Sequence, residues 1–489
     1  MKIAFVASEA VPYSKTGGLA DVVGALPKAL AKLGHQVEVI LPRYRMTKSA
    51  RALPEFASLT IPFPASFKFA AVEAGTDPAA PQTLLVDCPE YFDRDGLYQA
   101  AGQDYPDNAE RFAAFSLAAI EFLKRSEEPP AVIHCHDWQA ALVPIYLRHT
   151  YARDPFFKKT ATLFTIHNLA YQGVFPPALL PRLGLSMDLY TMEKLEFYGK
   201  VNPLKGGILF SDYISTVSRK YADEIQTIEF GCGLEGVLRA RAGRLRGILN
   251  GVDYEAWNPA TDNLIPAHYT PENTEGKKIS KKALLEKMGA LKPQLAKPVI
   301  GIVSRFATQK GFDLIEAVAP KLMAMDLYIA ALGTGEPRYE ELFRKLAVEF
   351  PQKFLVKVAY DNALAHLIEA GSDFFLMPSQ YEPCGLNQIY SLKYGTVPIV
   401  RATGGLDDTI EPFDGQAGTG FKFHEYQPAA LLACIEQALE AYRHPAAWRR
   451  LVQNGMSKDF SWDRSAREYV ALYETLAGAR KTASLAAAI

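Results

Sequence analysis

A lysine and two glycines stand together near the start of the chain, in "SKTGGLADVV" at residues 14–23. Glycine leaves backbone N–H groups uncovered, and the N–H groups at a helix start attract an anion, to which Lys15 adds positive charge. Gly17 and Gly18 therefore predict contact with a phosphate group. A tight turn with a solvated lysine explains the same residues, and neither the dinucleotide fingerprint nor the P-loop motif is present.

A second basic segment, "SRFATQKGFD" at residues 304–313, lies far along the chain. Arg305 offers a rigid fork of donors that fits a diphosphate, and Lys310 offers a compact charge that can follow a leaving phosphate. Gly404 and Gly405 in "RATGGLDDT" precede another expected helix, so we expect them to bring further N–H groups onto phosphate. A solvated basic turn is the alternative for the arginine and lysine.

One carboxylate stands out, Glu382 in "MPSQYEPCGLNQIY". It comes after an expected strand and before an expected helix. A carboxylate there can hold sugar hydroxyls or stabilise cationic charge developing at an anomeric carbon. An ordinary helix-capping acid explains Glu382 equally well.

Histidines end two expected strands. His167 and Asn168 close "TLFTIHN", where a histidine can donate to a hydroxyl or carbonyl, although a structural histidine is the commoner case. In "HCHDW", His134 and His136 share one face of a strand that ends at Asp137. Two such histidines are a weak metal signal because no third ligand is evident from the spacing, and we expect no metal.

An Asp-x-Asp pair, Asp93 and Asp95 in "FDRDG", has the spacing that metal-dependent glycosyltransferases use. It lies in a loop-like stretch and we treat it as background. Neither a G-x-S-x-G elbow nor an H-E-x-x-H motif is present, which removes the local support for serine hydrolase and zincin chemistry.

The composition is that of an ordinary globular protein. With 53 Lys+Arg against 54 Asp+Glu, nothing points to a nucleic-acid or membrane partner. The sequence has no stretch of about 20 apolar residues and no signal peptide pattern. Five cysteines without C-x-x-C spacing argue against a disulfide framework, so we expect a cytoplasmic protein.

Strands and helices alternate in two series, which predicts parallel sheets built from βαβ units. Such sheets bind ligands at the carboxyl ends of their strands, where the residues above fall. Strands are expected at 2–8, 36–42, 131–136, 161–168 and, in the second series, from 298–306 to the segment "TVPIVR". We expect an α/β protein with an N-terminal Rossmann-like domain over 1–250, a second over 251–460, and a final helix over 461–489 that packs on the second domain or crosses back to the first.

Seven segments resemble the bacterial glycogen synthase and plant starch synthase family, in the family's order over nearly the whole chain. They are "KTGGLADVVGALPKAL", "HCHDWQAALVP", "TIHNLAYQGVF", "GILNGVD", "SRFATQKGFDL", "YEPCGLNQIYSLKYGTVPIVRATGGLDDT" and "FSWDRSAREYVALYE". The residues alone indicate a two-domain protein for a phosphorylated ligand, and the reaction comes from the resemblance.

The resemblance implies a GT-B fold, two Rossmann-like domains facing each other across a deep cleft. It implies transfer of glucose from ADP-glucose to the non-reducing end of an α-1,4-glucan, with retention of anomeric configuration, release of ADP, and no cofactor or metal. Oligomeric state stays open.

The family's functional residues map onto positions of this sequence. Lys15 and Gly18 would meet the donor diphosphate together with Arg305 and Lys310. Glu382 matches the catalytic glutamate, and His167 the histidine near the sugar 6-hydroxyl. The remaining implied substrate contacts are Asp21, which orients the glycine loop, Asp137 on the acceptor side, Asn168 and Asn250 beside the histidine, Tyr360 on adenine, and the N–H groups around Cys384, Gly385 and Leu386.

One position departs from the wider pattern of retaining relatives, which carry a second glutamate eight positions after the first. Here that position is Tyr390, as the resemblance to the synthases implies, and the ribose contact stays unassigned. The alternatives are a UDP-glucose-dependent enzyme of the same fold, a pyridoxal-phosphate-dependent phosphorylase, and a non-catalytic glucan- or nucleotide-binding protein.

Overall fold

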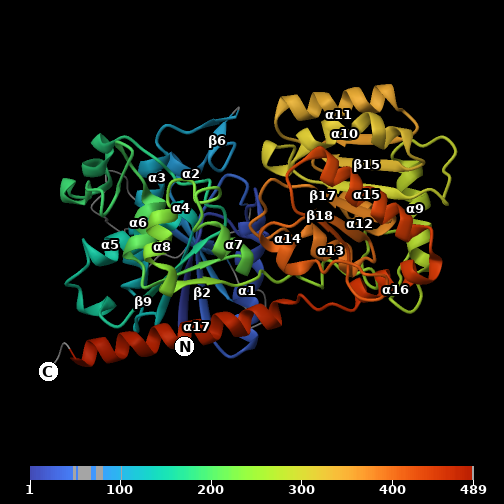
Figure 1. The fold of residues 1–489 in the computed structure, drawn as a ribbon. Helices are drawn as coiled ribbons and strands as arrows, with labels where there is room; N and C mark the ends of the chain where they lie inside the picture. Colours follow the sequence, from blue (N-terminus) through green and yellow to red (C-terminus); the bar gives the residue numbers. More distant parts are fainter. Residues whose placement is uncertain (48–50, 53–67, 73–80, 101, 487–489) are drawn as a thin grey trace. The chain divides into compact units, whose positions relative to one another are not determined.

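The chain forms two compact units in the computed structural model, which describes residues 1–47, 51–52, 68–72, 81–100 and 102–486. Unit 1 comprises Met1–Val217, Ala222–Gly251 and Trp462–Ile489, and unit 2 comprises Ser218–Tyr221 and Val252–Ser461. The main crossover therefore lies between Gly251 and Val252, and the chain returns to unit 1 at Trp462. Each unit is an α/β structure with a parallel sheet, as the alternating sequence pattern predicts (Figure 1).

Unit 1 is built on a nine-stranded sheet of order β13-β12-β9-β8-β1-β2-β5-β4-β3. The strands from β13 to β5 pair in parallel, and β4 pairs antiparallel with both β5 and β3. Their bounds are β1 Lys2–Val6, β2 Gln36–Pro42, β3 Arg51–Ala52, β4 Lys68–Val72, β5 Gln82–Asp87, β8 Val132–His136, β9 Ala161–Ile166, β12 Tyr213–Thr216 and β13 Leu245–Gly247.

Helices pack on this sheet because its strands are apolar on both faces. Ile3 and Phe5 of β1 share a core with α1 (Gly18–Lys32) and α17 (Trp462–Ala486), while Ala4 and Val6, which alternate with them, are fully buried on the opposite side. The other unit 1 helices are α2 Pro89–Phe92, α3 Asn108–Leu123, α4 Asp137–Ala140, α5 Leu142–Arg148, α6 Pro203–Phe210, α7 Arg219–Glu224 (whose first three residues belong to unit 2) and α8 Glu235–Ala240.

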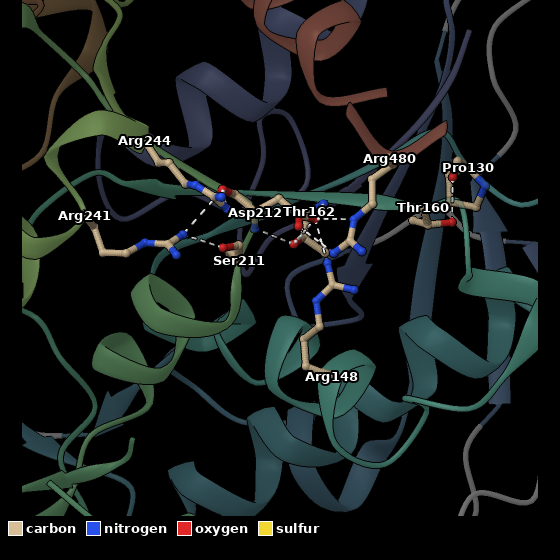
Figure 2. A network of polar contacts seen from close by, with 9 residues as sticks. All are labelled: Pro130, Arg148, Thr160, Thr162, Ser211, Asp212, Arg241, Arg244 and Arg480. Atoms are coloured by element: carbon tan, nitrogen blue, oxygen red, sulfur yellow. Dashed lines mark hydrogen bonds and ion pairs between the residues drawn. The ribbon is translucent and has the colours of Figure 1, made fainter. Parts of the chain in front are cut away.

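The last helix, α17, lies along unit 1 beside α1 (Figure 1). Its Arg480 donates to Asp212 Oδ1 at 2.5 Å, and Arg148 from α5 donates to Oδ2 of the same carboxylate at 2.7 Å (Figure 2). Thr162 of β9 also donates its backbone N–H to Oδ2, at 2.8 Å. One carboxylate therefore ties two helices to a strand. Residues 487–489 lie outside the described residues.

Unit 2 has a fully parallel six-stranded sheet of order β16-β15-β14-β17-β18-β19. Its strands are β14 Val299–Val303, β15 Tyr328–Gly333, β16 Phe354–Val358, β17 Phe374–Met377, β18 Val397–Arg401 and β19 Phe421–Phe423. Its helices are α9 Glu275–Lys287, α10 Phe312–Ala324, α11 Pro337–Glu349, α12 Asn362–Gly371, α13 Asn387–Lys393, α14 Gly404–Thr409, α15 Pro428–Tyr442 and α16 Pro445–Met456.

The predicted strands are confirmed to within two or three residues where the apolar run is long, as at Lys2–Val6 and Ala161–Ile166. Strand β5 was not predicted, and neither were β12 and β13, which are four and three residues long, because so short a run carries little periodicity. The strongly charged helix α9 was not predicted either. In the described residues, no helix is both long and apolar enough to cross a membrane.

Candidate functional site

In unit 1, three ionisable residues follow three neighbouring parallel strands. Glu9 comes after β1, Asp137 directly after β8, and His167 directly after β9, and these strands are adjacent in the order β9-β8-β1. Parallel neighbours end at the same edge of the sheet, so their carboxyl ends gather the three side chains there.

Glu9 accepts hydrogen bonds from Thr16, in the glycine loop at residues 15–18. This buried carboxylate accepts a hydrogen bond from the Thr16 backbone N–H and, at 2.8 Å each, from Thr16 Oγ1 and the Tyr98 hydroxyl. Ser8 Oγ lies 2.7 Å from the same Tyr98 hydroxyl. Burial raises the pKa of Glu9. Glu9 was not predicted from the sequence, because no motif around position 9 indicates that the chain folds back to place Thr16 beside it.

The glycine loop itself leads straight into α1. Gly17 is the N-cap in an extended conformation, and a Cβ atom added at Gly17 or Gly18 would meet nothing within 4 Å. The fold's own packing therefore does not demand glycine at either position, and the space beside both is open. Lys15 donates to Asp21 Oδ1 at 2.7 Å, with its side chain 42% exposed.

Asp137 orients the end of the next strand. Its Oδ1 accepts the backbone N–H of His167 at 2.7 Å, and its own φ of 56° is a left-handed conformation that Asp and Asn tolerate better than most residues. Removal of the carboxyl group from water raises the pKa of Asp137 to about 7. Asn168 turns its Oδ1 back to the Ala170 backbone N–H at 3.1 Å.

His167 belongs to a buried group of three histidines. His136 Nδ1 and His167 Nε2 are 2.9 Å apart, and the ring centroids of His134 and His136 are 4.0 Å apart. Burial lowers the pKa of His167 to about 3 and those of the other two well below the usual value, so all three are neutral. His134 is bonded to Tyr473 and Thr165, at 2.8 and 2.5 Å.

Asn250 follows β13, the edge strand of the same sheet. The residue is 4% exposed, and its buried Oδ1 has no hydrogen-bond partner among the residues that the structure describes. An unpaired buried amide oxygen is costly, so this atom is suited to a partner that a ligand brings.

A depression of about 500 Å³ is lined by residues that lie close in sequence to Asp137 and Asn168, among them Trp138 and Ala170. Trp138 forms part of its wall, and Gly173 packs against that ring so closely that a Cβ atom would lie 2.4 Å from it. The wall combines aromatic, polar and small apolar residues: Asp104, Tyr105, Asn108, Trp138, Ala170, Tyr171, Gln172, Gly173, Val174, Phe175 and Cys232. Such walls suit sugar rings, which present an apolar face and a hydroxyl rim.

In unit 2, the centre of the candidate site is an ion pair. Lys310 Nζ donates to Glu382 Oε2 at 2.6 Å, with side chains 18% and 8% exposed, and Ser379 Oγ donates to the same oxygen at 3.0 Å. The lysine follows β14 and the glutamate follows β17, which are neighbours in the sheet. The structure therefore joins the predicted phosphate-binding lysine to the predicted catalytic carboxylate.

The loop after Glu382 is clamped by Gln388, which sequence reasoning also missed. Its Nε2 donates to the carbonyl oxygens of Cys384 and Gly385, at 3.0 and 3.1 Å. Gly385 has a φ of 68°, a left-handed conformation for which glycine is suited. Gln388 thus occupies both carbonyl groups, and Leu386 stands at the N-cap position of α13.

Gly404 and Gly405 pack against the backbone of the loop that contains Glu382. The Gly405 N–H donates to the carbonyl oxygens of Glu382 and Pro383, at 3.1 and 3.2 Å, so this amide supports the glutamate loop and is not free for phosphate. A Cβ atom on Gly404 would lie 2.0 Å from the Glu382 carbonyl oxygen. The Gly405 amide is engaged within the protein because two backbone segments meet here, and the contact with phosphate stays a prediction.

The remaining predicted residues of unit 2 lie at strand ends as well. Arg305 is exposed two residues after β14, and Tyr360 is 81% exposed two residues after β16. Tyr390 is buried and stacks on Trp257, with ring centroids 4.0 Å apart and planes at 4°. The position where relatives carry a second glutamate is thus part of an aromatic stack.

The Asp-x-Asp pair is engaged elsewhere. Arg45 donates to Asp93 Oδ1 at 2.7 Å and is also paired with Asp95. Among the residues that the structure describes, no group of three or more His, Cys, Asp and Glu side chains has a metal-binding arrangement.

Comparison with known proteins identifies the family. Residues 2–240 match the starch synthase catalytic domain family, and residues 286–455 match the glycosyl transferases group 1 family. The chain is 55% identical to a glycogen synthase of Koribacter versatilis over 97% of its own length and 98% of that protein's. It is 48% identical to a glycogen synthase of Anaeromyxobacter dehalogenans, over 98% and 100% respectively.

Solved structures agree with the sequence comparison. The catalytic domain of starch synthase IV from Arabidopsis thaliana, bound to ADP and acarbose, matches with a TM-score of 0.89 and 34% identity, over 97% of this chain and 99% of that one. Sucrose-phosphate synthase from Thermosynechococcus elongatus shares the fold, with a TM-score of 0.61 and 19% identity, over 98% and 99%. The predicted GT-B class with two Rossmann-like halves is confirmed, and the chain belongs to the glycogen synthase and starch synthase family, whose members are glucosyltransferases.

Proposed function

We propose that this protein transfers glucose from ADP-glucose to the non-reducing end of an α-1,4-glucan, retains the anomeric configuration and releases ADP. The buried Lys310–Glu382 pair carries this proposal, because it sets a cation for a leaving phosphate beside a carboxylate for the sugar. The starch synthase IV structure, which holds ADP, supports adenine as the base of the donor. No cofactor is required for this chemistry.

In unit 1 the proposed donor contacts are the first N–H groups of α1 and Lys15. The open space beside Gly17 and Gly18 allows phosphate oxygens to reach these N–H groups, which carry the positive end of the helix dipole. Asp21 holds Lys15 in the absence of phosphate, at 2.7 Å. His167, Asn168 and Asn250 are proposed to contact glucose hydroxyls.

In unit 2 Arg305 and Lys310 are proposed to stabilise the negative charge that builds on ADP. A preorganised donor of this kind lowers the barrier by about 3–4 kcal/mol. Tyr360, which is 81% exposed, offers a free ring face to adenine. The N–H groups near Cys384, Gly385 and Leu386 are proposed to hold glucose hydroxyls, because Gln388 already occupies two carbonyl groups of this loop.

Retention is proposed to proceed by attack on the face that ADP leaves. The bond between the anomeric carbon and the β-phosphate oxygen breaks, a bond to the acceptor 4-hydroxyl oxygen forms on the same side, and the hydroxyl proton passes to the departing phosphate. Glu382 stabilises the positive charge at the anomeric carbon. It reaches that role once phosphate draws Lys310 away from it.

The acceptor glucan is proposed to lie in the depression beside Trp138. Tyr171, which is 52% exposed, offers its ring to a glucose unit, and the exposed Asp104 offers a carboxylate to sugar hydroxyls. Asp137 precedes this wall in the chain and is proposed to act on the acceptor side.

Polymer formation from radiolabelled ADP-glucose and a glucan primer tests the reaction. We expect label in polymer, and a kcat/KM for UDP-glucose well below that for ADP-glucose. Equal use of both donors would overturn the donor assignment. Glu382→Gln is expected to abolish transfer while ADP still binds, and transfer at the wild-type rate would overturn the catalytic role. Trapping of a glucosyl ester on any Asp or Glu would overturn front-face attack.

A further inference from the structure

His136 is fully buried, and the proposed reaction gives it no task. Its ring lies against Phe5, with centroids 5.3 Å apart and planes at 20°, and against His134. Its Nδ1 faces His167 Nε2 at 2.9 Å, and its buried Nε2 has no hydrogen-bond partner within the described part of the chain. Burial holds the pKa of both rings far below neutrality, so each ring carries one N–H and one lone pair.

Two arrangements of protons satisfy the 2.9 Å contact. In the first, His136 Nδ1–H donates to His167 Nε2, the second proton of the pair lies on His167 Nδ1, and His136 Nε2 is a bare lone pair. In the second, His167 Nε2–H donates to His136 Nδ1, and His136 then holds a buried N–H at Nε2 with no acceptor. An unpaired buried N–H is rarer in proteins than an under-used acceptor, which favours the first arrangement.

The first arrangement determines what His167 presents to a ligand. With its Nε2 lone pair occupied, the ring carries its proton at Nδ1, where the described residues supply no partner. Asp137 fixes the backbone of His167 at 2.7 Å but does not touch the ring. The tautomer of His167 is thus decided by His136 alone.

We infer that His136 is a positioning residue that keeps His167 as the Nδ1–H tautomer, so that His167 donates a hydrogen bond to a hydroxyl oxygen of the transferred sugar. This inference rests on the proposed function for its ligand, the glucosyl group. It does not rest on it for the tautomer, which is a property of the protein without ligand.

The tautomer is measured directly in protein labelled with ¹⁵N-histidine. Nine histidines contribute signals, and His167→Ala assigns the one of interest by its disappearance. We expect the two-bond ¹⁵N–¹H pattern of the Nδ1–H form for His167 in the wild type. The Nε2–H pattern would overturn the inference.

Three substitutions separate the hydrogen bond from simple packing. His136→Asn places an amide N–H near the position of Nδ1, whereas His136→Gln places it near Nε2, and His136→Leu removes it. We expect the Leu and Gln variants to lose about 10- to 100-fold in kcat/KM for transfer, the loss typical when the partner that orients a functional histidine is removed, and the Asn variant to recover most of it. Equal losses in all three would overturn the inference.

A double-mutant cycle completes the test. In a His167→Ala background, His136→Leu is expected to cost less than threefold, because the group it positions is gone. An undiminished cost would show that His136 acts through packing and overturn the inference. If the wild type transferred no glucose from any nucleotide sugar, the proposed function would fail, and the tautomer spectrum would still decide the role of His136.

Discussion

The candidate sites of the two units hold their buried carboxylates in different ways. In unit 1, Glu9 and Asp137 accept hydrogen bonds from backbone N–H and hydroxyl groups, and burial raises the pKa of each. In unit 2, Glu382 is bonded to the ammonium of Lys310 at 2.6 Å. Neutral donors fix the shape of a loop, whereas an ion pair also stores a charge that a ligand can displace. The carboxylates of unit 1 therefore fix loop conformations, and the carboxylate of unit 2 belongs to an ion pair that a charged ligand can displace.

The largest effect is expected for Lys310→Ala, which leaves Glu382 buried without its cation. Breaking a buried pair by removing one partner costs about 3–5 kcal/mol of stability, and we expect somewhat less here because Lys310 is 18% exposed. Transfer from ADP-glucose is expected to fall by about 100-fold or more. Denaturant unfolding and donor kinetics measure the two effects.

A matched control exists in the same unit, where Lys281 Nζ lies 2.7 Å from Asp373 Oδ2 in a pair of similar burial. Lys281→Ala is expected to destabilise unit 2 and leave the KM for the donor unchanged at temperatures where the protein is folded. Equal kinetic losses in both variants would mean that Lys310 acts only through stability.

Glu9→Gln is expected to have the next largest effect, because an amide has one acceptor oxygen, whereas Glu9 uses Oε2 for the Thr16 backbone N–H and Oε1 for the Thr16 and Tyr98 hydroxyls. Hydrogen bonds to a charged acceptor contribute about 1.5–3 kcal/mol, so we expect a loss of about tenfold or more in kcat/KM for ADP-glucose. Tyr98→Phe removes one of these bonds and is expected to cost less. Kinetics of both variants rank them, and a larger loss for Tyr98→Phe would contradict the role of Glu9.

Asp137→Asn is expected to change how stability depends on pH. The folded pKa of about 7 lies above the ordinary value of 3.8, so the wild type loses stability relative to the variant as pH rises from about 4 to about 7. The difference is absent below this window and constant above it. Asn keeps both the acceptor oxygen and the left-handed backbone. Melting temperatures of both proteins at pH 5 and pH 8 measure the effect, and a difference that shrinks with pH would contradict it.

The smallest effect on stability is expected for the exposed pair of Lys15 and Asp21. With side chains 42% and 27% exposed, the pair contributes less than about 1 kcal/mol. Lys15→Ala is therefore expected to leave the melting temperature nearly unchanged while raising the KM for ADP-glucose. Asp21→Asn, which keeps the lysine, is expected to raise it less. An unchanged KM in Lys15→Ala would remove this lysine from the donor site.

Sequence by itself determined the strand ends and the kinds of group placed there. Long apolar runs fixed β1, β9 and β14, because a buried parallel strand must be apolar on both faces, and the polar residues that follow each run were therefore placed at one edge of a sheet. Lys15, His167 and Glu382 were found in this way. The resemblance of this protein to its family rests on the same segments.

Only the tertiary structure decided which groups meet. The partners Glu9 and Thr16, Lys310 and Glu382, and Gly405 and the Glu382 carbonyl are separated by loops, helices and strands, and no local pattern records a contact that depends on strand order and loop path. The same is true of His136, whose lone orphaned nitrogen is visible only once the neighbouring strand has placed His167 beside it. The local sequence determines the chemical group at each position, and tertiary packing determines which partner that group contacts.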